Sequence, residues 1–202
     1  MPELFVDIGA TTREEAEAKV QIGDVAVYVT NFVEMGSRVS SGALDDRIAC
    51  AAVVEAFRTM QNVHDVYAVF TVQEEVGLRG AGAAAYAIEP DLNISLDVTG
   101  TGDTPKCGRM SVKLGAGATV KVMDSSVIVP PVVRAFLVEA ADEKNIRWQP
   151  EVLRAGGTDT GAVQRTRGGI LSGCISIPTR YIHSPVETAD MGDYEAAVQL
   201  VC

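Results

Sequence analysis

The sequence has few basic residues and few histidines. Lys and Arg number 17 against 27 Asp and Glu, which gives a formal net charge of −10 at pH 7. A surplus of negative charge repels phosphate backbones and anionic lipid headgroups, so it argues against nucleic acid and membrane partners. The sequence offers two histidines, His64 and His183, to any site that needs an imidazole.

Cysteine pairs and long apolar runs are also missing. The four cysteines lie far apart, with no Cys-x-x-Cys pair: Cys50, Cys107, Cys174 and Cys202. This spacing argues against a disulfide framework or a zinc ribbon and favours the reducing cytosol, so we expect a cytoplasmic protein. No apolar run approaches the roughly 20 residues that span a bilayer. The start of the sequence lacks the basic and apolar segments of a signal peptide.

The pattern of apolar residues predicts an α/β fold. The 202 residues, 47% of them hydrophobic, are enough for one domain with a core. Alternating or continuous apolar runs predict strands, and apolar residues at helical spacing predict helices. The expected strands are 4–9, 25–29, 69–72, 93–98, 111–114, 119–122, 148–153 and 170–177. The expected helices are 12–20, 48–60, 80–88, 130–145, 162–165 and 190–201.

Acidic residues follow several of these elements. Glu74 and Glu75 come directly after the predicted strand 69–72, and two adjacent carboxylates repel each other unless a cation or a shared proton relieves them. Asp45 and Asp46 precede a predicted helix, where an isolated pair would cap the helix and interact with its dipole. Asp97 lies near the end of the predicted strand 93–98. Ligands of α/β sheets lie at the carboxyl ends of strands, so these acids can meet at one edge.

Together with His183, these acids form a metal-ligand set. Carboxylates and imidazole bind zinc, cobalt or manganese. Two ions about 3.5–4 Å apart need one bridging carboxylate and further ligands on each ion. A carboxylate outside the ligand set can take the proton from the attacking water. The loop 99–103 contains Gly and Thr, but no Gly-Lys-Ser/Thr follows, which excludes a P-loop.

Several motifs resemble those of the glutamyl-aminopeptidase and deblocking-aminopeptidase family. They occur in order along the chain at 4–10, 43–47, 73–81, 97–99, 156–159 and 178–184. The resemblance implies a three-layer α/β/α sandwich with a mixed central sheet, two zinc or cobalt ions, a peptide substrate and a homo-oligomer that is a tetrahedral dodecamer. It also implies that residues 1–30 are a remnant of an inserted β-rich dimerisation domain. Residues 31–202 would then be the catalytic domain, incomplete at its N-terminal part.

The resemblance assigns metal ligands by position. Asp45 would bridge both metals, and Asp46 would follow it through a cis peptide bond. Glu75 and Asp97 would each bind one metal, and His183 would complete the shell of one of them.

The resemblance also assigns residues to catalysis and substrate binding. Glu74 would be the general base and later the acid that protonates the leaving amine. Thr158 and Asp159 would be wall residues of the substrate pocket.

One family feature is missing from the sequence. The family has a further metal-binding histidine in a His-x-Asp motif upstream of the Asp45-Asp46 pair, and His64 lies at the wrong place to replace it. The chain is therefore expected to be an N-terminally truncated form. Three alternatives follow for this form: it binds no metal, it binds one metal ion, or it is inactive. The alternatives are another two-metal hydrolase, such as a carboxypeptidase or deacylase, a relative that carries an endoglucanase label, or an inactive remnant.

Overall fold

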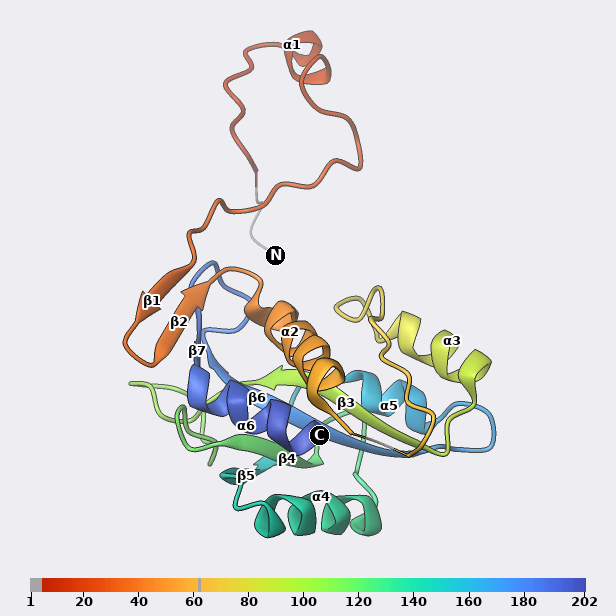
Figure 1. Ribbon diagram of the computed structural model, residues 1–202. Helices are drawn as coiled ribbons and strands as arrows, with labels where there is room; N and C mark the ends of the chain where they lie inside the picture. Colours follow the sequence, from red (N-terminus) through yellow and green to blue (C-terminus); the bar gives the residue numbers. More distant parts are fainter. Residues whose placement is uncertain (1–4, 62) are drawn as a thin grey trace.

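The computed structural model describes residues 5–61 and 63–202 (Figure 1). The helices are α1 Arg13–Glu17, α2 Leu44–Thr59, α3 Arg79–Ile88, α4 Pro131–Glu143, α5 Asp159–Gln164 and α6 Met191–Val201. The strands are β1 Val33–Met35, β2 Arg38–Ser41, β3 Leu92–Thr99, β4 Ala118–Met123, β5 Trp148–Val152, β6 Leu171–Arg180 and β7 Glu187–Asp190. Among the described residues, none of these helices combines the length and the apolar character that crossing a membrane requires.

The strands form one mixed sheet around β6. Strand β6 pairs in parallel with β3 and in antiparallel with β4 and β7, and the order β1-β2-β7-β6-β4-β5 completes the sheet. In the β3–β6 register, Asp97 lies opposite Ser176. Because β3 and β6 are parallel, both strands end at the same edge, so the chain after β6 passes close to the end of β3.

One face of the sheet is apolar and carries the main core. Its buried side chains include Val98, Val120, Ile175 and Ile177, which pack against α2, α4 and α6. Helix α5 contacts β3 and β6, and α3 packs against α5 in a second, smaller apolar cluster. Helices therefore cover both faces of a mixed sheet, as the family resemblance implies.

The opposite face is polar although it is buried. Glu151 accepts hydrogen bonds from Thr99 Oγ1 at 3.0 Å and from Thr119 Oγ1 at 2.6 Å, and it pairs with the buried Lys121 ammonium. Buried charges are tolerated when they are paired and hydrogen-bonded in this way. Residues two apart in a strand share a face, so Asp97 lies on this polar face with Thr99.

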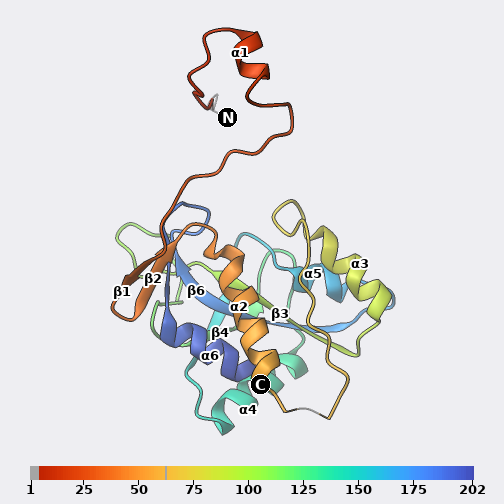
Figure 2. The same cartoon turned by 45° about the horizontal axis from the view of Figure 1, so that its top comes forward.

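Residues 5–29 extend away from the body of the molecule (Figures 1 and 2), and the chain returns to it at Thr30, whose Oγ1 accepts the N–H of Gly42. The predicted helix at 12–20 is present as the shorter α1, which is capped by Thr12. The strand predictions at 25–29 and, for the described part, at 4–9 are wrong because these residues have no regular structure. Their apolar side chains are exposed, with Val27 at 82% and Val29 at 98%, and none of the strands in the described residues pairs with them.

The strand predicted at 69–72 is also not formed. Val69, Phe70 and Val72 are 41%, 52% and 68% exposed, and no described strand pairs with this segment. The segment 111–114 is irregular as well. An extended segment becomes a strand only when another strand satisfies its backbone hydrogen bonds. Apolar, β-branched composition does not provide that partner.

Candidate metal centre

The first part of the candidate site comes from the junction of β2 and α2. Asp45 and Asp46 lie in the first turn of α2 but have non-helical backbone angles, and the peptide bond between them is cis. Ala43, the N-cap residue of α2, has a left-handed backbone with φ 56°. The two acids therefore neither cap α2 nor continue its regular turn, and they do not fulfil the ordinary role of first-turn acids.

Two groups of possible metal ligands share Asp45. In the first group, His183 Nε2 lies 3.2 Å from Asp45 Oδ2 and 3.5 Å from Glu75 Oε2. In the second group, Asp45 lies with Asp46 and Asp97, and one oxygen of each lies within 4.8 Å of the others. The structure therefore brings together Asp45, Glu75, Asp97 and His183 from four separate segments. We call these four residues and Asp46 the candidate metal centre.

The donor set fits divalent cations. Four carboxylates and one imidazole are ligands of the kind that zinc and cobalt accept. Asp46 Oδ1 is buried and has no hydrogen-bond partner among the described residues. A buried carboxylate oxygen without a partner is costly, and a cation would satisfy it. Asp45 has a nearly buried side chain, whereas the His183 side chain is 72% exposed, so the centre is open on its histidine side.

Burial and mutual repulsion raise the pKa values of these acids. Burial and the charge of Glu75 raise the pKa of Asp45 to about 6. Burial and the charge of Asp97 raise the pKa of Asp46 to about 10. Burial raises the pKa of Asp97 well above its ordinary value, although the N–H of Val98 donates to its Oδ1 at 2.7 Å and opposes the shift. Without a cation the centre therefore retains protons, and a divalent cation would replace them.

The raised pKa of Asp45 predicts how the stability of the metal-free protein depends on pH. The carboxyl binds its proton more tightly in the folded state, with a pKa of about 6 against 3.8. Its contribution to stability is therefore fully present below about pH 4 and is lost as pH rises through 6. Between pH 4 and 7, the free energy of unfolding of the wild type should fall by on the order of 1 kcal/mol more than that of an Asp45→Asn variant, because solvent screens part of the shift. Urea titrations in the presence of a chelator measure this difference, and parallel curves for the two proteins would contradict it.

Glu74 lies beside the centre but belongs to neither ligand group. Its backbone carbonyl accepts hydrogen bonds from the N–H groups of Gly77 and Leu78, which form a tight turn after the two glutamates. Burial and the charges of Glu75 and Asp159 raise the pKa of Glu74 to about 7. A carboxyl with this pKa can both accept and release a proton near neutral pH.

The two predicted substrate-pocket residues have different environments. Thr158 is buried, and its hydroxyl donates to Asp124 Oδ2 at 3.2 Å. Asp159 accepts a hydrogen bond of 2.6 Å from Thr71 Oγ1 through Oδ2, whereas its buried Oδ1 has no partner among the described residues. Burial raises the pKa of Asp159. Among the described residues, Asp159 Oδ1 is therefore an acceptor without a donor. The Thr158 hydroxyl, in contrast, is already hydrogen-bonded inside the fold.

The segments that carry the centre contain left-handed backbone conformations at residues other than glycine. Gln73, Leu78, Tyr181 and His183 all have φ between 57° and 62°. Such conformations are uncommon for residues with a Cβ. They also occur away from the centre, at Glu89, Lys106, Asn145 and Arg167, so they do not by themselves mark the site.

Sequence reasoning missed one acid of this region. Glu187 is 2% exposed and accepts hydrogen bonds from the backbone N–H groups of Asp45 and His183. The one sequence feature that could have indicated Glu187 is its position four residues after His183. No periodic pattern distinguishes Glu187 from the other acids of the chain. His64 is exposed and belongs to neither ligand group in the described part of the chain.

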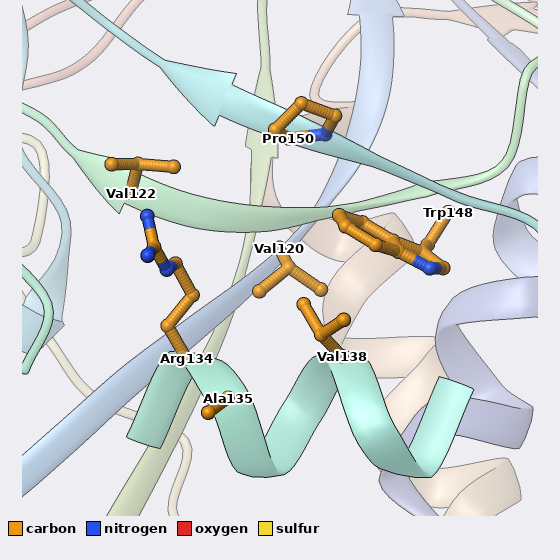
Figure 3. Close-up of a pocket in the computed structure, with 7 residues that line it drawn as sticks. All are labelled: Val120, Val122, Arg134, Ala135, Val138, Trp148 and Pro150. Atoms are coloured by element: carbon orange, nitrogen blue, oxygen red, sulfur yellow. The ribbon is translucent and has the colours of Figure 1, made fainter. Parts of the chain in front are cut away.

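One apolar cavity next to the sheet is unrelated to this centre. It has a volume of about 290 Å³ and lies between α4 and strands β4 and β5 (Figure 3). Val120 and Val138 face each other across it, beside Trp148. Its lining contains no carboxylate and no histidine: Val120, Val122, Arg134, Ala135, Val138, Trp148 and Pro150. This cavity therefore offers none of the chemistry of the candidate metal centre.

Comparison with known families identifies the chain. A family model described as M42 glutamyl aminopeptidase matches residues 1–200. The chain belongs to this family, which confirms the resemblance found in its motifs.

Individual relatives and structures agree with the family match. A protein of Acetivibrio thermocellus is 53% identical over 202 residues, which are 100% of this chain and 61% of that protein. A lysyl aminopeptidase of Pyrococcus furiosus is 39% identical over 201 residues, 98% of this chain and 57% of that protein. The chain thus spans about three fifths of the length of these curated relatives.

Solved structures confirm the mixed α/β fold. An aminopeptidase from the archaeon Desulfurococcus kamchatkensis superposes with a TM-score of 0.90 at 40% identity, over 96% of this chain and 56% of that one. A TET1 peptidase of Pyrococcus horikoshii, which can assemble into a tetrahedron or a large octahedral shell, has a TM-score of 0.82 at 34% identity. That match covers 96% of this chain and 58% of that one.

Proposed function

We propose that this chain forms the catalytic part of a metal-dependent aminopeptidase, which hydrolyses N-terminal residues from peptides. The observation that carries the proposal is the pair of ligand groups that share Asp45, in a chain of the M42 glutamyl aminopeptidase family. Asp45 would hold two divalent cations, zinc or cobalt. Glu75 and His183 would hold one of them, and Asp97 the other.

Bound divalent cations supply Lewis acidity, which polarises the scissile carbonyl and lowers the pKa of water. The chain supplies the proton transfers through Glu74. Its carboxylate takes a proton from the attacking water and gives it to the leaving amine. The proximity of Glu74 to the candidate metal centre, without membership in either ligand group, supports this role.

The substrate would enter from the exposed His183 side of the centre. Asp159 Oδ1, which is buried and lacks a partner in the described part of the chain, is the proposed acceptor for a cationic group of the peptide. Thr158 precedes it as the N-cap residue of α5, where its side chain makes no capping hydrogen bond. A free amino terminus close to the ligands would explain removal of single residues from one end.

The domain organisation is part of the proposal. We assign residues 1–30 to an inserted β-rich domain and residues 31–202 to the catalytic domain. The projection of residues 5–29 from the body supports this division (Figure 2). A homo-oligomer is proposed by analogy with the assembling TET1 peptidase. Cytoplasmic placement is supported by four cysteines that are all free.

Hydrolysis of aminoacyl-nitroanilides with added zinc or cobalt tests the activity. We expect release of nitroaniline that depends on the added metal and stops with a chelator. Turnover confined to N-blocked or C-terminal substrates would replace the proposal with a carboxypeptidase or deacylase, and turnover of a β-glucan would replace it with an endoglucanase. Absence of turnover on all of these substrates would point to an inactive remnant.

A further inference from the structure

A single buried carboxylate connects two distant residues of the candidate metal centre. Glu187 Oε2 accepts the backbone N–H of Asp45 at 2.9 Å, and Glu187 Oε1 accepts the backbone N–H of His183 at 2.8 Å. Asp45 and His183 are 138 positions apart in the sequence. The two carboxylate oxygens of one side chain therefore hydrogen-bond the backbones of both Asp45 and His183.

The pairing of β2 with β7 produces this arrangement. Ser41, the last residue of β2, lies opposite Glu187, the first residue of β7. The chain leaves β2 directly toward Asp45, and it reaches β7 directly from the loop that carries His183. Glu187 therefore lies where the two ligand-bearing segments come together.

A carboxylate is the side chain that this geometry requires. Two N–H donors arrive at two different oxygens, and an amide side chain has only one oxygen acceptor. The additional negative charge is unfavourable next to Asp45, whose ionisation it opposes. A turn that needed only a polar cap could use a neutral side chain without this repulsion.

We propose that Glu187 is a positioning residue for the metal ligands. By fixing the backbones of Asp45 and His183, it sets the 3.2 Å separation of Asp45 Oδ2 and His183 Nε2 before any cation binds. Sites that hold ligands in advance bind metal more tightly, because ordering is not required at the moment of binding. This inference rests on the proposed metal centre.

The chain contains a matched control at Asp193. This residue is also buried, and its two oxygens accept the backbone N–H groups of Gly115 and Gly117, each at 2.7 Å. Asp193 belongs to neither ligand group in the described residues. Asp193→Asn therefore removes the same type of interaction as Glu187→Gln, but at a place that positions no metal ligand.

Zinc affinity, measured by calorimetry on the two variants and the wild type, tests the inference. Both variants should lower the melting temperature of the metal-free protein. Glu187→Gln should also weaken zinc binding about 10–100-fold, whereas Asp193→Asn should leave it unchanged. Equal zinc affinity in the wild type and Glu187→Gln, or equal losses in both variants, would overturn the inference.

Further outcomes separate this inference from the proposed function. If the wild type binds no zinc, the metal centre itself is wrong and the positioning role fails with it. If the wild type binds zinc and Glu187→Gln binds it equally well, only the positioning role fails.

Hydrogen exchange on the wild type provides the test if Glu187→Gln does not fold. The amides of Asp45 and His183 should exchange slowly in the metal-free protein. Zinc should slow them further and leave Gly115 and Gly117 unaffected. Fast exchange at Asp45 and His183, or no response of these amides to zinc, would overturn the inference.

Discussion

Replacing Glu74 with glutamine is expected to lower kcat about 10²–10⁴-fold while zinc affinity stays at the wild-type value. Glutamine has nearly the same shape but cannot take a proton from water. Glu74 lies outside both ligand groups, so the cations should remain bound. Steady-state hydrolysis of an aminoacyl-nitroanilide gives kcat, and calorimetric titration with zinc gives the affinity.

The neighbouring Glu75 is the control for this experiment. Glu75→Gln makes the same chemical change one residue further on, but it alters a member of the ligand group with Asp45 and His183. It should therefore weaken zinc binding. If Glu74→Gln retained wild-type turnover, or lost zinc as Glu75→Gln does, Glu74 would not be the base of this site.

Asp45→Asn is expected to weaken zinc binding more than about 100-fold, beyond the 10–100-fold typical of residues that only support a ligand. Asp45 belongs to both ligand groups, so its loss removes a charged donor from each. The stabilisation that zinc gives the wild type, about 4 kcal/mol at a concentration 1,000 times Kd, should largely disappear in the variant. Melting curves with and without zinc measure this difference.

Asp103 provides the control variant for this prediction. It lies beyond the end of β3 and pairs with Arg180, at 2.8 Å, rather than with the candidate metal centre. Asp103→Asn should lower stability through the lost ion pair, yet zinc should stabilise this variant as it does the wild type. If Asp45→Asn kept the full stabilisation by zinc, the bridging role of Asp45 would be wrong.

Local sequence patterns predicted several of the elements that pack or pair within this chain, but not the short strands β1, β2 and β7. The predicted strands 93–98 and 170–177 correspond to β3 and most of β6. The Ala-rich run 80–88 and the amphipathic segment 130–145 gave α3 and α4 close to their observed bounds. The segments 25–29 and 69–72 are more uniformly apolar than β3 but remain irregular and exposed. Strand formation depends on a hydrogen-bonding neighbour as much as on the residues of the strand itself.

The candidate site was partly predictable from the sequence because Asp97 lies near the end of β3 and Asp45 and Asp46 open α2. Glu74 and Glu75 follow the irregular segment 69–72, so the strand predicted before them does not explain their position. The role of Glu187 was not predicted from the sequence, because it arises from the register of two strands of four residues each, β2 and β7. Neither strand has enough residues for its pairing to be predicted from a pattern.

Anomalous diffraction from crystals of this chain grown with zinc would test the central claim most directly. We expect zinc peaks within coordination distance of Asp45, one shared with Glu75 and His183 and another shared with Asp97. Zinc bound only at other surfaces, with Asp45 and His183 left uncoordinated, would contradict the metal centre and the peptidase chemistry built on it.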